Sequence, residues 1–338
     1  MTIQPVAGAP GPPSGSYDAD IVILALERPD ETIAAIQSAR GQTGIAAHIF
    51  VLDQGSCPGT LHRLAAAAAD GPNVTLLATT DNLGVAGGRT LISDLGHGRI
   101  VVALDNDAEF ATPDTVARMA AALDADPGLA AIGCRIVSQD SGADDLSSWG
   151  YPASLLPRAG DCFDAVTYVG AGHAIRRTAW AQAGGYDHAL FFCWEEFDFC
   201  LRAIALGWRI RYRGDIAILH KIAPGQRVAW TTRRWFYFVR NRLYIERKLG
   251  RGWLSVTPRI AGYLIKGLRN RLAGQTVRAI LAAARMQLPP HCRPMPPSGW
   301  SYIAANDSAY RGSPLHRLTR EVFAVLRRAP DAAATTGR

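Results

Sequence analysis

The sequence predicts an α/β fold built on a mostly parallel, doubly wound sheet flanked by helices. Two observations predict this fold class. Five apolar runs of strand length lie between Asp20 and Val137, and a helical segment separates each run from the next. Because neighbouring parallel strands need crossover connections, such alternation favours a parallel sheet. With 338 residues, 48% of them hydrophobic, the chain is long enough to bury the core of such a sheet.

The elements of the first half follow in order. Residues 1–17 are rich in Pro, Gly and Ser and lack a basic start followed by an apolar stretch, so we expect a disordered leader and no signal peptide. The strands are predicted at 20–26, 46–52, 73–79, 99–104 and 129–137, and the helices at 29–40, 61–69, up to about 95, and 113–123. The carboxyl ends of these strands should form one ligand-binding edge.

The pattern becomes irregular in the second half. Residues 138–164 are polar with Gly and Pro, and they form either an insertion that lines a cleft or a plain surface loop. A strand at 165–169, a short helix at 176–183, a helix at 195–206 and a strand from 209 that leads to His220 are predicted next.

The basic charge lies in one late segment. The whole chain carries +7, but residues 227–285 hold fourteen Arg or Lys and the single acid Glu246, so the rest of the chain sums to −6. Helices predicted at 230–248 and 253–285 interleave these cations with aromatic and aliphatic residues. They suit an anionic membrane surface, or they only pack on the domain formed by the preceding residues. A nucleic-acid partner is not expected, because no recognition module accompanies them.

Asp105-Asn106-Asp107 directly follows the buried strand at 99–104. Two carboxylates at a strand end suit a hard divalent cation, which can in turn hold a diphosphate. Taken alone, the tripeptide is equally typical of a turn, because Asp and Asn readily adopt turn conformations. Its functional reading therefore depends on the motifs around it.

Four motifs stand in a fixed order: Asp53 at a strand end, the glycine-rich loop 82–89, Asp105-Asn106-Asp107, and the segment 194–202. In this order and spacing the chain resembles family 2 glycosyltransferases of the GT-A fold, close to rhamnosyltransferase-like members. The resemblance covers roughly residues 21–245. It departs from the family at Thr90, where Asn is usual, and at Glu196, where Asp is usual.

The resemblance implies a binding site for a nucleotide diphosphate sugar. Asp53 would bind the nucleobase, Asp105 would contact the ribose or a metal-bound water, and Asp107 would ligate Mg²⁺ or Mn²⁺ directly. His220, which follows Glu196 by 24 residues, matches a metal-ligating His of some members, although a lone His is often structural. The residues implied on the donor side are Asp53, Asn82, Gly84, Gly87, Arg89, Asp105 and Gly172.

The same resemblance assigns the catalytic base. Glu196 occupies the position of the acid that deprotonates the acceptor hydroxyl, one methylene longer than usual, and Asp198 is the alternative base. Arg202, four residues beyond Asp198, can pair with it on one helix face. The acceptor side would include Trp194, Glu195, His173 and Asp187.

The sequence therefore predicts an inverting, metal-dependent glycosyltransferase with a Rossmann-like GT-A domain and a C-terminal helical extension. The expected acceptor is a glycan, a lipid-linked molecule or a small molecule, in the synthesis of a polysaccharide or glycoconjugate. The alternatives are a sugar-nucleotide nucleotidyltransferase and a non-catalytic nucleotide-sugar-binding protein. We expect a leader at 1–17, a catalytic domain at 18–225, a basic extension at 226–290 and a Pro-rich, partly disordered tail at 291–338. With no apolar run of eighteen residues, the protein should be cytoplasmic, with possible peripheral attachment to the inner face of the cell membrane through residues 227–285.

Overall fold

The computed structural model describes residues 3–221, 230–289, 292–313 and 326. The chain divides into two compact units. The first unit comprises Met1–Phe191, Glu195–Ile222 and Pro296–Arg311, and the second comprises Phe192–Trp194, Ala223–Met295 and Gly312–Arg338.

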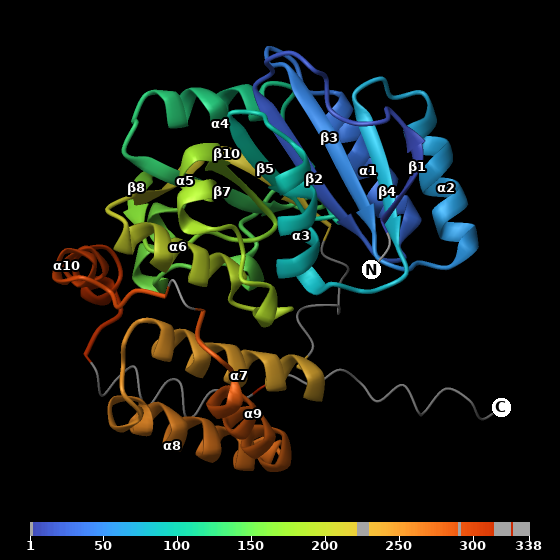
Figure 1. The fold of residues 1–338 in the computed structure, drawn as a ribbon. Helices are drawn as coiled ribbons and strands as arrows, with labels where there is room; N and C mark the ends of the chain where they lie inside the picture. Colours follow the sequence, from blue (N-terminus) through green and yellow to red (C-terminus); the bar gives the residue numbers. More distant parts are fainter. Residues whose placement is uncertain (1–2, 222–229, 290–291, 314–325, 327–338) are drawn as a thin grey trace. The chain divides into compact units, whose positions relative to one another are not determined.

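The first unit is a mixed sheet with helices on both faces (Figure 1). Its strand order is β1-β4-β3-β2-β5-β9-β7-β10-β6, and β8 pairs with β10. The strands are β1 (Ile3–Gly8), β2 (Ala19–Ala25), β3 (Ala47–Asp53), β4 (Val74–Thr79), β5 (Ile100–Leu104), β6 (Ala108–Phe110), β7 (Leu129–Ser138), β8 (Cys162–Ala165), β9 (Gly172–Arg176) and β10 (Arg209–His220). The helices are α1 (Pro29–Arg40), α2 (Pro58–Ala69), α3 (Gly84–Leu95), α4 (Thr115–Asp124), α5 (Arg177–Ala183), α6 (Glu195–Ala205) and α10 (Pro297–Asn306).

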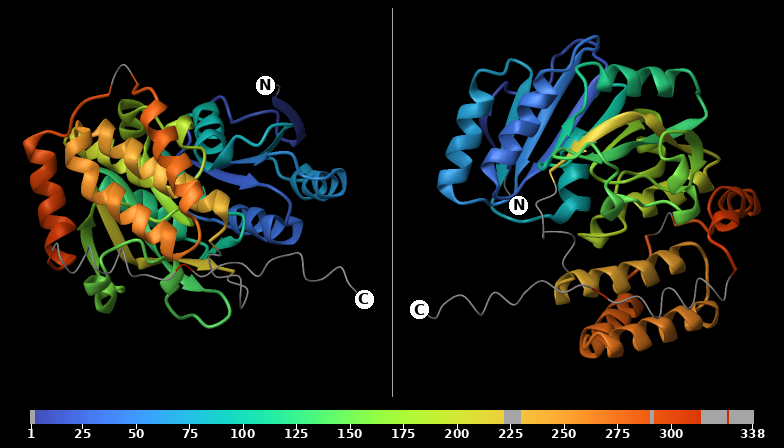
Figure 2. Two further views of the ribbon diagram at one scale, coloured as in Figure 1. Left: turned by 90° about the horizontal axis from the view of Figure 1, so that it is seen from below. Right: turned by 180° about the vertical axis from the view of Figure 1, so that it is seen from behind.

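The central block β4-β3-β2-β5 is parallel, and β7 runs parallel to β10. Every residue of β5 is buried, as a strand covered on both faces requires. Helices α1 and α2 lie on one face and α3 on the other, which the two views of Figure 2 also show. Both α1 and α2 start with proline, whose fixed φ suits the first helical position. The predicted α/β fold class is thus confirmed.

The structure differs from the prediction at the amino terminus. Ile3–Gly8, inside the predicted disordered leader, forms β1 and pairs antiparallel with β4. The sequence did not predict this edge strand because Ile3 and Val6 do not alternate with period two, and Gln4, Pro5 and Gly8 between or beside them are not typical of a strand. Pairing with β4 supplies the stabilisation that local sequence does not reveal.

Antiparallel strands are the second difference. A strand was predicted at 165–169, whereas the structure has β8 ending at Ala165 and β9 beginning at Gly172. Strand β9 lies antiparallel between β5 and β7. Gly172 pairs with Leu104, and a Cβ at this glycine would clash with the side chain of Ile218. The close approach of two elements, which sequence periodicity does not report, therefore sets where β9 begins.

The second unit contains α7 (Thr232–Lys248), α8 (Trp253–Arg269) and α9 (Ala273–Arg285). Its core contains Trp235, Leu243 and Tyr263, and the Trp235 indole N–H donates to Thr276 Oγ1 at 2.9 Å. The single helix predicted at 253–285 is wrong, because the chain turns between α8 and α9, where Arg271 has φ +55°. The expected membrane segment 227–285 includes residues 227–229, which lie outside the described residues.

The predicted tail at 291–338 is only partly described. Within it, α10 belongs to the first unit, where the Tyr302 hydroxyl donates to Ala165 O at 3.1 Å and accepts from the Ile210 N–H at 3.1 Å. The predicted boundaries therefore differ from the observed units. None of the helices in the described ranges has the length and apolar character needed to cross a membrane.

Candidate active site

Each residue of Asp105-Asn106-Asp107 has its own side-chain partner. Asp105 Oδ1 accepts from Arg89 Nη2 at 2.5 Å, and Asn106 Nδ2 donates to Thr32 Oγ1 at 3.2 Å. These contacts fix the segment between α3 and α1, at the carboxyl end of β5. Because all three side chains of this turn have hydrogen-bond partners, the turn is preorganised, as a binding site requires.

Asp107 lies between two positively polarised groups. Its Oδ2 accepts from Arg28 Nη1 at 2.8 Å, and its Oδ1 lies 3.4 Å from His220 Nε2. The sheet brings His220 there, because β6 pairs antiparallel with β10 and sets His220 opposite Ala108. Burial opposes ionisation of Asp107, but His220 and Arg28 outweigh it and lower the pKa of this carboxyl below its usual value.

Asp145 orients His220 from the other side. Its Oδ2 lies 2.9 Å from His220 Nδ1, and it also accepts from the Ser147 N–H and from the hydroxyls of Ser147 and Ser148. Burial alone would lower the pKa of His220, but its hydrogen bonds to Asp107 and Asp145 raise it to about 10. A carboxylate on one ring nitrogen directs the other nitrogen toward a metal position.

These donors fit a small divalent cation. Two ligand atoms at right angles, each about 2.1 Å from Mg²⁺ or Mn²⁺, would be about 3.0 Å apart, close to the 3.4 Å between Asp107 Oδ1 and His220 Nε2. Within residues 3–221, 230–289, 292–313 and 326, no three His, Cys, Asp or Glu side chains form a ready metal cluster. The protein thus offers two direct donors, of which His220 must release its proton when the cation binds. Mg²⁺-like cations usually complete their coordination with water and substrate phosphates.

Arg89 joins the metal-side acid to the predicted base. Its guanidinium is buried, donating to Asp105 and Gly170 O through Nη2 (2.5 and 2.8 Å) and to Glu196 Oε1 through Nη1 (3.2 Å). Burial raises the pKa of Glu196, and Arg89 only partly offsets that rise. A carboxyl with a raised pKa is a better proton acceptor when ionised, which suits general-base chemistry.

Glu195, beside Glu196 at the start of α6, is also buried. Burial, followed by the neighbouring Glu196 charge, raises its pKa well above the usual value. Its Oε2 has no hydrogen-bond partner among the described residues. Of the two adjacent carboxyls Glu195 and Glu196, Glu196 is the one that forms a hydrogen bond with the Arg89 guanidinium.

Asp198 has a different environment from Glu196. It is buried and pairs with Arg202 at 2.8 Å, which confirms the predicted contact on one helix face. Arg202 also donates to Ala183 O and to Gly185 O, the latter at 2.7 Å. Arg202 thus holds α6 against the end of α5, and Asp198 pairs with Arg202, whereas Glu196 pairs with Arg89.

The predicted donor-side residues have clear local contacts. Asn82 Oδ1 accepts from the Gly84 N–H at 2.8 Å, and Gly84 has φ +71° and packs so tightly that a Cβ would clash with Phe191 O. At Gly87 a Cβ would come within 3.1 Å of the Leu83 Cβ. Close packing alone explains these glycines, so their contact with a donor stays a prediction.

Asp53 is buried at the end of β3. Its Oδ2 accepts from the Gly55 and Ser56 N–H groups at 3.2 and 3.1 Å, and its Oδ1 accepts from the Ser56 hydroxyl. These bonds close a turn after the strand. Its contact with a nucleobase stays a prediction.

The predicted acceptor-side residues each have a local environment. His173 is fully buried in β9, with Nε2 2.9 Å from the Tyr186 hydroxyl and its ring stacked on Tyr168. Asp187 accepts from the Ala189 N–H at 3.0 Å and caps a short 3₁₀ turn, η3 (His188–Leu190). Trp194, which belongs to the second unit, directly precedes Glu195 in the chain. The contact of these residues with an acceptor stays a prediction.

Two residues of the site, Arg28 and Asp145, were missed from the sequence. Arg28 follows the first predicted strand directly, so its place at the ligand edge of the sheet was a usable signal. Asp145 lies in the irregular insertion 138–164, where only the adjacent Ser147-Ser148 hinted at a capped turn. Neither residue is close in sequence to Asp107 or His220.

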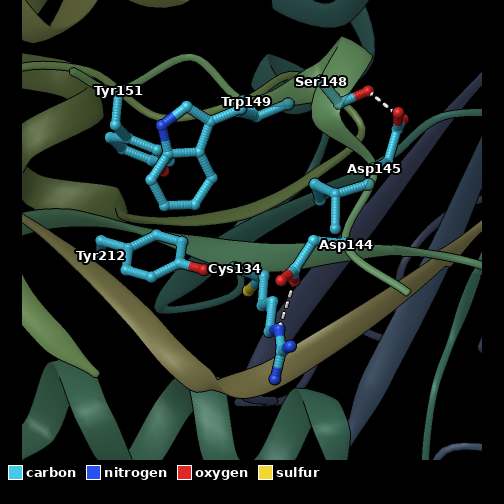
Figure 3. A pocket seen from close by; sticks show the side chains of 10 residues that line it. Cys134, Asp144, Asp145, Ser148, Trp149, Tyr151 and Tyr212 are labelled. Carbon is cyan, nitrogen blue, oxygen red and sulfur yellow. Dashed lines mark hydrogen bonds and ion pairs between the residues drawn. The ribbon is translucent and has the colours of Figure 1, made fainter. Parts of the chain in front are cut away.

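Part of the insertion 138–164 packs against β7 and Tyr212 around a very small pocket, so whether the insertion lines a cleft stays a prediction. Trp149, Tyr151 and Tyr212 form the aromatic part of the lining, and Asp145 lies at its edge, bonded to Ser148 (Figure 3). The Asp144 carboxylate, also in the lining, pairs with Arg135 at 2.6 Å. Asp145, which contacts His220, therefore lies beside a packed aromatic cluster.

Known proteins resemble this chain in sequence and in fold. Residues 20–182 match the family described as Glycosyl transferase family 2. The succinoglycan biosynthesis protein ExoO of Rhizobium meliloti (strain 1021) is 34% identical over 108 residues, which are 32% of this chain and 30% of that protein. The chain therefore matches less than a third of this curated relative's length.

Two solved structures share the fold. The mannosyltransferase PcManGT from Pyrobaculum calidifontis, in complex with GDP-Man and Mn²⁺, has a TM-score of 0.56 and 18% identity over 93% of this chain and 86% of its own. GalNAc-T7 with UDP, GalNAc and Mn²⁺ has a TM-score of 0.57 and 13% identity over 79% of this chain and 55% of its own. Residues 20–182 of this chain therefore resemble glycosyl transferase family 2, and the chain has the GT-A fold that the two solved structures share.

Proposed function

We propose that this protein is an inverting glycosyltransferase that uses a divalent cation to move a sugar from a nucleoside diphosphate sugar to an acceptor hydroxyl. One observation carries the proposal. Arg89 links Glu196, a partly buried carboxyl with a raised pKa, to Asp105, two residues from the Asp107–His220 pair. A proton acceptor and a pair of metal donors thus share one site.

The residues divide the reaction between them. Glu196 accepts the proton of the acceptor hydroxyl while that oxygen forms a bond to the anomeric carbon and the bond to the diphosphate breaks. A single in-line displacement inverts the anomeric configuration. When bound by Asp107 and His220, the cation would offset the charge that develops on the diphosphate. Arg89 holds the Glu196 carboxylate in place, and Asp145 keeps the His220 ring oriented.

The substrate classes follow from the same site and from the relatives. The donor is a nucleoside diphosphate sugar, in line with the GDP-Man and UDP in the names of the structural neighbours. The cation is Mg²⁺ or Mn²⁺. The acceptor is a glycan, a lipid-linked molecule or a small molecule, and the name of ExoO supports a role in the synthesis of a polysaccharide.

The test is release of nucleoside diphosphate from a panel of nucleotide sugars, with and without Mn²⁺. Cation-dependent release of a nucleoside diphosphate supports the transferase. Release of pyrophosphate from a nucleoside triphosphate and a sugar phosphate would support the nucleotidyltransferase. Binding of a nucleotide sugar without turnover, with every acceptor class tested, would support the non-catalytic alternative.

The second unit supports a peripheral site on the cytoplasmic face of the cell membrane. The large hydrophobic side chains that α8 exposes are Trp253, Leu254, Leu264, Ile265 and Leu268. At 3.6 residues per turn these positions share an arc of about 120°. Helix α8 also carries three cations and no acid, and within residues 230–289 the single acid, Glu246, is buried among arginines. An apolar arc in a cationic unit fits an anionic lipid surface.

Co-sedimentation with vesicles tests this attachment. We expect the protein to bind vesicles that contain phosphatidylglycerol and not vesicles of phosphatidylcholine alone. The double variant Leu254→Glu and Leu268→Glu should lose at least about tenfold in binding, because burying each leucine stabilises by about 1.5–3 kcal/mol. Leu146→Glu, an exposed leucine of the first unit, is the matched control and should bind normally. Equal binding by all variants would contradict the proposed face.

A further inference from the structure

Two consecutive residues after β2 have an unusual backbone. Glu27 has φ +55° and Arg28 has φ +56° with ψ +57°, the left-handed region. Outside glycine this conformation is strained, and a residue before proline, as Arg28 is, is normally extended. Glycine would adopt it at no such cost. Two large side chains in this strained conformation indicate that each side chain has a structural or functional role.

The role of Glu27 is structural, because its side chain binds the first turn of α2. Its Oε1 accepts from the Cys57 N–H at 2.7 Å and its Oε2 accepts from the Thr60 hydroxyl at 2.9 Å, so it anchors the first turn of α2. Both oxygens are used within the fold. This leaves Arg28 as the strained residue without a structural explanation.

Arg28 forms an ion pair with Asp107, the carboxylate predicted to bind the metal. Its Nη1 donates to Asp107 Oδ2 at 2.8 Å, while Nε lies 3.6 Å from Glu31 on the first turn of α1. The side chains of Arg28 and Asp107 are 39% and 20% exposed, so the pair is open to solvent on the side of Arg28. The guanidinium therefore occupies one oxygen of the carboxylate whose other oxygen faces His220.

We propose that Arg28 is the resident counter-ion of Asp107, which competes with the divalent cation for that carboxylate and pairs with the donor's diphosphate once the cation is bound. The pairing of Arg28 with the diphosphate rests on the proposed function. Two positive groups cannot both bind one carboxylate without repulsion, so the arrival of the cation weakens the Arg28–Asp107 pair. The released guanidinium then lies beside the anionic diphosphate, and its planar fork matches phosphate oxygens.

This role makes two opposite predictions for the loss of the Arg28 charge. In the absence of nucleotide, Arg28→Gln should bind Mn²⁺ about two- to fivefold more tightly, because a partly exposed ion pair worth up to about 1 kcal/mol no longer competes. In saturating Mn²⁺, the same variant should bind UDP or GDP about tenfold more weakly, because a charge-assisted hydrogen bond to phosphate is lost. A purely structural residue would not move the two affinities in opposite directions.

The experiment measures both affinities on the full chain. Free Mn²⁺ is followed by electron paramagnetic resonance, and UDP and GDP binding in saturating Mn²⁺ by calorimetry. Arg28→Gly is the second variant, which removes the charge, relieves the backbone and should show the same pair of shifts with a higher melting temperature. Arg63→Gln is the matched control, because Arg63 makes a similar ion pair with Asp30 at 2.5 Å on the surface.

The outcomes separate this inference from the proposed function. If the wild-type protein binds Mn²⁺ and nucleotide but Arg28→Gln and Arg28→Gly leave both affinities unchanged, the role of Arg28 is wrong and the transferase stands. Weaker Mn²⁺ binding by both variants without nucleotide also overturns the competition. If the wild-type protein binds no Mn²⁺ at any concentration up to millimolar, the metal site itself fails, and this inference fails with it.

Discussion

Gly170 offers a way to move the proposed base without removing any charged group. A Cβ at this position would meet Glu196 Oε1 about 1 Å inside the 3.4 Å at which ordinary van der Waals contact begins, with Arg89 Nη1 at that limit. Gly170 does not have positive φ, so alanine fits the backbone. In Gly170→Ala the flexible Glu196 carboxylate must therefore retreat by about 1 Å.

The expected effect is a loss of catalysis with little loss of stability. A misplacement of about 1 Å in a reacting group can lower the rate about 100-fold. The strain on the Arg89–Glu196 bond is partly offset by the lower entropy of the unfolded alanine chain, so we expect the free energy of unfolding to change by less than about 2 kcal/mol. Donor affinity in Mn²⁺ should not change.

The assay compares kcat for sugar transfer, donor affinity by calorimetry and the thermal unfolding midpoint. Gly59→Ala is the control, because a Cβ there meets nothing within 4 Å, and it should behave like the wild type. A Gly170→Ala protein that is folded, binds donor and transfers sugar at the wild-type rate would refute the assignment of Glu196 as the proton acceptor.

Three further predictions follow from single contacts. Glu196→Gln should keep donor binding and stop transfer, since the amide cannot accept the proton; substantial transfer in a donor-release assay would return Asp198 to consideration. Asp145→Asn should weaken Mn²⁺ binding about 10- to 100-fold by loosening the ring of His220, measured by calorimetry, with unchanged affinity excluding that role. Burial lowers the pKa of His48 to about 4, so the unfolded chain takes up its proton first as the pH falls below about 6.5. The free energy of unfolding should then be about 2 kcal/mol lower at pH 5 than at pH 7, and His48→Gln should remove most of that difference in urea titrations.

Much of the fold could be predicted from the sequence because local patterns determine it. Strand β5 is a continuous apolar run that is buried on both faces, and α2 is an Ala-rich segment that begins at Pro58. The Asp198–Arg202 pair was also predictable, because residues four apart share a helix face. In each case the information lies within a few residues of the feature.

Only part of the candidate site could be predicted from the sequence, because many of its contacts join residues that are far apart in the chain. Asp105, Asp107 and Glu196 could be found because each follows a strand or begins a helix, where ligand-binding acids belong. Their partners could not, since the contacts join residues far apart in the chain. Arg89 reaches Glu196 across 107 positions and Arg28 reaches Asp107 across 79.

By itself the sequence determined the parallel core, the placement of its acidic motifs at strand and helix ends, and the cationic helices that follow. Tertiary structure alone decided that β9 runs antiparallel beside β5, that β6 sets His220 against Asp107, and that Asp145 turns its ring. The physical reason is the range of the forces. Periodicity and helix caps act within one element, whereas strand register and buried ion pairs depend on which elements pack together.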